Sequence, residues 1–223
     1  MKVGVGTGLL LLLPALAAAT RHPDAQVALE VLLPPRPGFF PEAAPLRFVL
    51  LDHGQVFVGG ISLLAEGTLE KAELEELDLQ IAAVRKLAGL GSSVTFGPGE
   101  TEYRLWLRRG RSLEIVARGD PAAATAALKP LAQLIERLAR MNPTSLMPLA
   151  PRQYLLSARE QTLDGGCRPW SLPAPISDVL AAPRVVPADA AHTWPTGAVA
   201  ASVCAGDKHY AVTLRPLLPG EKP

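Results

Sequence analysis

Short apolar runs separated by polar turns give the first indication of the fold. Residues 46–51 and 56–60 flank a polar stretch at 52–55, a pattern that predicts a β-hairpin. Residues 27–33 form an earlier apolar run, which we expect to be an edge strand. Prolines follow that run closely, so we predict that the second half of residues 20–45 is a linker.

A second hairpin is predicted at residues 103–108 and 112–118. The three-residue loop between these runs places Leu107 opposite Leu113, and the apolar faces of the two strands then coincide. The same register turns Trp106 to the outer face, together with the arginines on either side of it.

Two amphipathic helices are predicted around this hairpin. After Thr68, which can cap a helix, apolar residues recur at steps of three and four, as expected for one buried helical face. A second apolar stripe runs through residues 120–141, and Pro130 places the start of its regular part near that position. The two stripes consist of Leu74, Leu77, Ile81, Val84 and Ala88, and of Leu128, Leu131, Leu134, Ile135 and Leu138.

Prolines break the last third of the chain into short pieces. A strand is predicted at 152–159 and one or two helical turns at 176–182. The final element is predicted to be a hairpin, because Gly206 fits the first position of a tight two-residue turn. Its register pairs Val203 with Tyr210.

Together these patterns predict an α+β fold with an antiparallel sheet and two helices on one face, at residues 46–141. A signal peptide at 1–19 and the strand and linker at 20–45 precede it. A proline-rich, disulfide-tied C-terminal subdomain at 142–223 follows, ends in the β-hairpin and is free to complete the same sheet.

The N-terminal residues have the pattern of a secretory signal peptide. Lys2 gives a positive start, residues 9–16 an apolar core, and residues 17–19 the small side chains that signal peptidase requires. A membrane anchor would need about 20 apolar residues, and a lipid anchor would need a nearby cysteine. We therefore expect an exported protein, periplasmic or extracellular, with no stable membrane span after cleavage.

Composition and charge narrow the choice of partners. The 223 residues are 48% hydrophobic, which is typical of a globular protein, and their formal net charge is +1. Loss of Lys2 with the signal peptide brings the balance to zero. A nucleic-acid binder normally has a strong basic excess, so we expect no nucleic-acid partner.

Cys167 and Cys204 are the two cysteines of the sequence, and an even number in an exported chain favours a disulfide. The alternative is a Cys/His hydrolase that uses Cys167, because a thiolate nucleophile needs a neighbouring imidazole and an orienting carboxylate. Its candidate partners are His192, His209, Asp178, Asp189 and Asp207. A disulfide would consume the thiol, so we favour the bridge.

The sequence gives little indication of a metal site or of a glycosidase active site. Zinc ligands are usually closely spaced, whereas the histidines are scattered at 22, 53, 192 and 209, where we expect solvated or hairpin-face side chains. We therefore predict no metal or cofactor. A glycosidase needs two convergent carboxylates, which sequence spacing cannot reveal. The available ones are Glu66, Glu70, Glu100, Glu102 and Glu114.

The second hairpin carries the one surface feature that points to a ligand. Its arginines surround Trp106, and guanidinium groups beside an indole can bind an anionic surface or a protein partner. The alternative is that the arginine stems merely cover the tryptophan, while Glu102 and Glu114 offset the charge. The candidate binding residues are Arg104, Trp106, Arg108, Arg109 and Arg111, with Arg118 beside them.

Two further tryptophans, Trp170 and Trp194, lie in proline-rich loops. They can line a recognition groove or cap a small core. We favour the core, because irregular backbone often leaves a core open at one side.

Three segments are similar to those of uncharacterised exported bacterial proteins. They are DHGQVF at 52–57, GGCRPW at 165–170 and YAVTLRPLLPGE at 210–221. This resemblance implies a bacterial, extracytoplasmic origin and carries over no functional residue.

The sequence therefore favours a non-catalytic extracytoplasmic binding or interaction module. The reason is that a well-patterned core occurs beside no recognisable catalytic motif. The alternatives are the Cys167 hydrolase and an exported inhibitor of a secreted enzyme.

Overall fold

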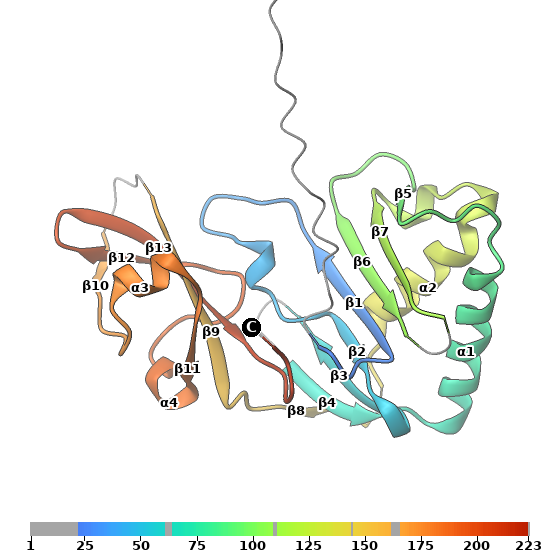
Figure 1. Ribbon diagram of the computed structural model, residues 1–223, viewed down its shortest axis with the longest axis horizontal. Helices are drawn as coiled ribbons and strands as arrows, with labels where there is room; N and C mark the ends of the chain where they lie inside the picture. The colour runs from blue at the N-terminus through green and yellow to red at the C-terminus, as the bar shows by residue number, and fades with distance from the viewer. Residues whose placement is uncertain (1–21, 61–63, 109–110, 144, 162–165, 223) are drawn as a thin grey trace, which may run out of the picture.

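The computed structural model describes residues 22–60, 64–108, 111–143, 145–161 and 166–222. In these ranges the chain forms two β-sheets and few helices, which confirms a mixed α+β class. Figure 1 shows the two sheets next to each other, the first built mainly from the N-terminal two thirds and the second from the C-terminal third. The predicted signal peptide lies outside the described residues.

The first sheet has eight strands in the order β5-β7-β6-β1-β2-β3-β4-β8. Neighbours pair antiparallel, except that the short edge strand β5 runs parallel to β7. β6 and β7 have the register read from the sequence, with Leu107 opposite Leu113. The strands are β1 Val27–Leu32, β2 Phe48–Leu50, β3 Gln55–Gly59, β4 Leu64–Thr68, β5 Ser93–Thr95, β6 Glu102–Leu107, β7 Leu113–Arg118 and β8 Met147–Pro148.

β1 is a central strand, so the prediction of an edge strand at 27–33 is wrong. It pairs with β2 on one side and β6 on the other. Val27, Ala28 and Leu29 are all fully buried, because one face of the strand meets the helices and the other meets a second apolar layer. A strand covered on both faces is a continuous apolar run, and such a run does not reveal how many neighbours the strand has.

Two helices, α1 Lys71–Arg85 and α2 Lys129–Arg140, pack on one face of the first sheet (Figure 1). α1 begins with a capping box, in which the backbone N–H of Glu70 donates to Oε2 of Glu73 at 2.8 Å. The predicted cap at Thr68 is therefore wrong, since Thr68 is the last residue of β4. Within the described ranges, short 3₁₀ turns connect the larger elements: η1 Pro41–Ala43, η2 Asp52–Gly54, η3 Pro121–Ala123 and η4 Ala126–Leu128.

The opposite face of the first sheet is covered by a smaller apolar layer. Trp106 lies there and is only 4% exposed, packed with Phe57 of β3 and with Leu218 near the C-terminus. Trp106 points away from the helices, as the predicted register requires, but the outer face on which it lies is covered and does not meet water there. The C-terminal residues return to this face and exclude water from it.

The second sheet has five strands in the order β10-β12-β13-β9-β11. It is separate from the first sheet, to which the C-terminal extension adds the short edge strand β8. β12 and β13 pair antiparallel across Gly206, with Val203 opposite Tyr210. One face packs on the short helices α3 Ile176–Ala181 and α4 Ala188–Ala191. The strands are β9 Gln153–Glu160, β10 Arg168–Pro169, β11 Arg184–Pro187, β12 Ala201–Ala205 and β13 Lys208–Pro216.

The proline-rich segment between β1 and β2 connects the sheets physically. The backbone N–H of Phe40 donates to the carbonyl of Ala198 at 2.8 Å, and that of Ala200 donates to Gly38 at 2.9 Å. The guanidinium of Arg159 lies over the ring of Phe40, 4.3 Å from its centroid. The segment predicted as a linker therefore packs against the second sheet.

Candidate functional site

A cavity of about 680 Å³ opens where the two sheets meet. Its walls come from β4, from the segment that leads into β9, from the end of β11 and from the C-terminal residues 217–221. We call this cavity the inter-sheet cleft. Apolar surface is supplied by Leu149, Leu217 and Leu218, and charged side chains by Glu66 and Arg152.

Glu66 reaches the cleft because of the alternation along β4. It is paired across the sheet with Phe57, and Leu64 lies two residues earlier on the same face of the strand. Phe57 and Leu64 belong to the apolar layer that faces the C-terminal residues, so Glu66 projects from that face at its edge, where it is half-buried. A carboxylate in this position can accept hydrogen bonds from a positively charged group in the cleft.

The opposite wall is held by backbone hydrogen bonds. The carbonyl of Arg152 accepts from Ala188 and the carbonyl of Gln153 accepts from Leu217, each at 3.0 Å. The backbone N–H of Leu149 donates to the carbonyl of Leu64 at 2.8 Å. The side chains of Arg152 and Gln153 are exposed at the cleft, while the backbone beneath them is fixed.

The C-terminal residues are anchored by a buried ion pair between Arg215 and Glu221. The second carboxylate oxygen of Glu221 accepts from the backbone N–H of Leu218 at 2.9 Å. From the N-terminal side, Nε2–H of His22 donates to the carbonyl of Pro219 at 2.9 Å. We call residues 217–221 the C-terminal strap, because this turn closes one side of the cleft.

The basic hairpin is largely neutralised by its own neighbours. Arg104 donates to Glu102 at 2.7 Å and to Glu30 at 3.5 Å, and Arg118 pairs with Glu102 at 2.8 Å. Burial by itself raises the pKa of Glu102, but the hydrogen bonds and positive charges of Arg118 and Arg104 outweigh it. The pKa of this carboxyl therefore lies below its ordinary value.

Two other described arginines of the hairpin, Arg108 and Arg111, have different surroundings. The guanidinium of Arg108 donates to the carbonyl of Pro23. Arg111 is exposed and lines a different cavity of about 560 Å³ together with Arg85, whose guanidinium donates to the carbonyl of Arg111. Arg109 lies outside the described residues. Binding of an anionic partner at this hairpin stays a prediction, and Trp106 is too buried to serve as its anchor.

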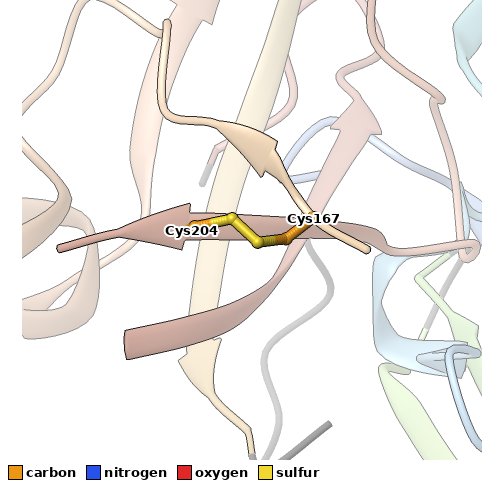
Figure 2. The surroundings of a disulfide bond; sticks show 2 residues. All are labelled: Cys167 and Cys204. Atoms are coloured by element: carbon orange, nitrogen blue, oxygen red, sulfur yellow. A yellow bond between two sulfur atoms is a disulfide. The ribbon is translucent and has the colours of Figure 1, made fainter. Parts of the chain in front are cut away.

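The predicted disulfide between Cys167 and Cys204 is confirmed, with a Cα–Cα distance of 5.5 Å. Figure 2 shows that it links the chain just before β10 to β12. β10 runs parallel to β12, and the backbone N–H of Trp170 donates to the carbonyl of Cys204 at 3.2 Å. The bridge therefore fixes the irregular segment before β10 to the edge of the second sheet.

The disulfide removes the thiol that the hydrolase interpretation requires. His209 lies opposite Cys204 in the β12–β13 register. Its cross-strand neighbour is therefore Cys204, not the candidate nucleophile Cys167. His192 donates from Nδ1 to the carbonyl of Asp189 at 2.6 Å, a local bond at the end of α4. While the bridge is formed, Cys167 has no thiolate to activate.

The histidines have different environments, and one differs from expectation. His22 is only 1% exposed and stacks on Phe57 with ring centroids 6.3 Å apart, so the prediction of a solvated or hairpin-face side chain is wrong there. His53 and His192 are exposed. Among the residues that the structure describes, no three His, Cys, Asp or Glu side chains form a group able to hold a metal ion.

Trp170 and Trp194 cap the core of the second sheet, as favoured from the sequence. Their rings meet edge to face with centroids 6.3 Å apart, and Trp194 is 6% exposed. Nε1–H of Trp170 donates to the carbonyl of Ala174 at 2.9 Å. The guanidinium of Arg168 covers the ring of Trp194 at 4.5 Å from its centroid.

The sequence did not single out the charged residues of the cleft. Glu66 was one of five carboxylates left open, and Arg152 carried no signal beyond its place at the start of a predicted strand. The run Leu217-Leu218-Pro219-Gly220 was the available clue, because two leucines followed by a turn are typical of a terminal segment that packs on a core.

Within the described part of the chain, no helix is long and apolar enough to cross a membrane. Comparisons with protein family models, with curated proteins and with solved structures find no match. The resemblance to exported bacterial proteins therefore stays a prediction, and the geometry of the chain itself has to support any functional proposal.

Proposed function

We propose that the protein is an exported, extracytoplasmic binding module whose ligand occupies the inter-sheet cleft. The observation that carries this proposal is the cleft itself, an open cavity of about 680 Å³ with a carboxylate and a guanidinium on its walls. Ligand sites in proteins are concave, mostly apolar and of this size, and they occur preferentially where two structural units meet.

The cleft is built to keep its shape. Pro151, Pro187 and Pro219 restrict the backbone at three points of the wall. The buried pair of Arg215 and Glu221 holds the C-terminal strap in place. A cavity with rigid walls costs a ligand little free energy of reorganisation, which favours binding as its function.

The disulfide supports the extracytoplasmic part of the proposal. Disulfides form and persist in oxidising compartments and are rare where thioredoxin and glutathione keep thiols reduced. The bridge of Cys167 and Cys204 agrees with export directed by the predicted signal peptide. The same disulfide supports a role in binding rather than catalysis, because it contains Cys167, the one predicted nucleophile.

The test is a binding map by two-dimensional NMR on the full-length chain, expressed with export to an oxidising periplasm and purified in the form that the host produces. Four panels serve as probes: amino acids and dipeptides, monosaccharides, organic acids, and aliphatic alcohols. We expect at least one panel to shift the backbone signals of residues 149–153 and 217–221.

The matched variants are Ala150→Trp, which fills the cleft, and Ala122→Trp, which adds the same bulk at an exposed site in η3. The first is expected to abolish the shifts and the second to leave them unchanged. If no panel moves these signals, or if Ala150→Trp leaves the shifts in place, the cleft is not a binding site and the proposal is wrong.

A further inference from the structure

The inter-sheet cleft holds two opposite charges, one from Glu66 and one from Arg152. Among the described residues, Glu66 and Arg152 form no ion pair and no side-chain hydrogen bond, although both line the cleft. The third charged group of the wall, Glu221, is committed to Arg215 and to the backbone of Leu218. The cleft thus offers one free negative and one free positive group.

The two charges differ in depth. Glu66 is half-buried against the apolar layer of the first sheet, whereas Arg152 is exposed. Charge-assisted hydrogen bonds are stronger where water is partly excluded. The half-buried carboxylate suits a positively charged group inside the cleft, and the exposed guanidinium suits a negatively charged group nearer to solvent.

The rest of the lining combines apolar side chains with one amide. Leu149, Leu217 and Leu218 line the cleft, and the exposed side chain of Gln153 can donate to and accept from a peptide group. A simple anion would be repelled by the carboxylate of Glu66. A metal ion needs several oxygen ligands, and the cleft offers it a single free carboxylate. The lining matches a molecule with an ammonium end, an apolar middle and a carboxylate end.

We propose that the ligand of the inter-sheet cleft is a short peptide with apolar side chains and free termini, its ammonium group bound by Glu66 and its carboxylate by Arg152. This inference rests on the proposed function, because it names the ligand of the same cleft. A free amino acid has the same two charges, but it would leave most of a cavity of about 680 Å³ unfilled. The peptide bond gives Gln153 a partner as well.

The experiment is isothermal titration calorimetry on the full-length, disulfide-bonded chain with three probes: Leu-Leu, N-acetyl-Leu-Leu and Leu-Leu amide. Each blocked peptide removes one terminal charge and keeps both apolar side chains. We expect both blocked peptides to bind at least about ten-fold more weakly than Leu-Leu, the equivalent of about 1.4 kcal/mol.

Two variants assign each end of the peptide. Glu66→Gln is expected to bind Leu-Leu more weakly than the original protein does, because the ammonium group no longer has a charged partner. For the same reason, this variant should bind Leu-Leu and N-acetyl-Leu-Leu with equal affinity. Arg152→Gln is expected to bind Leu-Leu and Leu-Leu amide with equal affinity, because the carboxylate of Leu-Leu no longer has a charged partner. The matched controls are Glu100→Gln and Arg140→Gln, which change the same charges at exposed positions outside the cleft and leave all three affinities unchanged.

Failure of this inference is distinguishable from failure of the proposed function. If the NMR panels move the cleft signals but Leu-Leu does not bind, or binds no better than its blocked forms, the peptide inference is overturned and the binding function stands. If Leu-Leu binds but Ala150→Trp does not weaken it, the peptide lies elsewhere and the inference is also overturned. If no probe moves the cleft signals, both proposals are wrong.

Discussion

Arg215 and Glu221 form an ion pair in which the two side chains are 3% and 0% exposed. They are six positions apart in the sequence, and the chain between them makes the turn of the C-terminal strap. The strap covers Phe57 and Trp106 of the first sheet and also walls the inter-sheet cleft. One buried pair therefore supports both the packing of a core layer and the shape of the candidate site.

Glu221→Ala is expected to destabilise the protein by about 3 to 5 kcal/mol, because it leaves the buried guanidinium of Arg215 without its carboxylate. Urea unfolding at neutral pH measures the loss. Glu160→Ala is the matched control, since Glu160 pairs with Lys208 on an exposed surface and its removal should change stability little. Equal losses for the two variants would contradict a structural role for the strap.

The disulfide gives a second prediction. Thiol titration of the denatured, unreduced protein should find no free thiols, because both cysteines form the bridge. The double variant Cys167→Ser with Cys204→Ser should lose about 4 kcal/mol of stability, since the bridge closes a long loop in the unfolded chain. Two free thiols in the exported protein would contradict the bridge and restore Cys167 as a candidate nucleophile.

Charge reversal at the basic hairpin now has an expected cost in stability. Arg104→Glu places a carboxylate beside Glu102 and the buried Glu30, so we expect a loss of about 1 to 3 kcal/mol. Arg111→Glu is the control, because Arg111 is exposed and its side chain lines the surface cavity near α1. Thermal unfolding of the two single variants should separate them clearly.

The lowered pKa of Glu102 predicts how stability responds to acid. Its pKa in the folded state lies below that in the unfolded state, which is near the ordinary value of about 4.3. The unfolded chain therefore binds a proton first as pH falls. The contribution of Glu102 is complete above that ordinary value and is lost as pH drops through the lower, folded-state pKa.

Glu102→Gln removes this acid dependence while keeping the shape of the side chain. We expect the difference in unfolding free energy between the original protein and Glu102→Gln to be larger at pH 7 than at pH 3. Glu100→Gln, at an exposed position two residues away, should show no such change between the two pH values. A constant difference for Glu102→Gln would mean that the ion pairs with Arg104 and Arg118 do not depend on the charge of this carboxylate.

Local patterns predicted the paired strands well because register depends on nearby residues. Leu107 lies opposite Leu113, and Val203 opposite Tyr210, since a short turn and the two-residue period of a strand leave one alignment that brings the apolar faces together. The cysteine pairing was also predictable, because the chain has two cysteines and so allows one intramolecular bridge. These features follow from the sequence near each position or from a count.

Contacts between distant segments were not predictable in the same way. The run at 27–33 was apolar, but its neighbours on both sides are β2 and β6, which are distant in the sequence. Trp106 was assigned to an outer face, and whether that face meets water depends on a strap more than 100 residues later. No local pattern carries this information.

The sequence by itself determined strands β1, β2, β3, β6, β7, β9, β12 and β13, the two main helices, the register of two hairpins and the disulfide. Each of these depends on local periodicity, turn chemistry or cysteine number. Only the tertiary structure decided that the chain forms two sheets, that the C-terminal strap buries Trp106, and that Glu66 and Arg152 share one cleft. The physical reason is that burial and the distance between charges depend on which remote segments pack together, and this is fixed by the free energy of the whole fold.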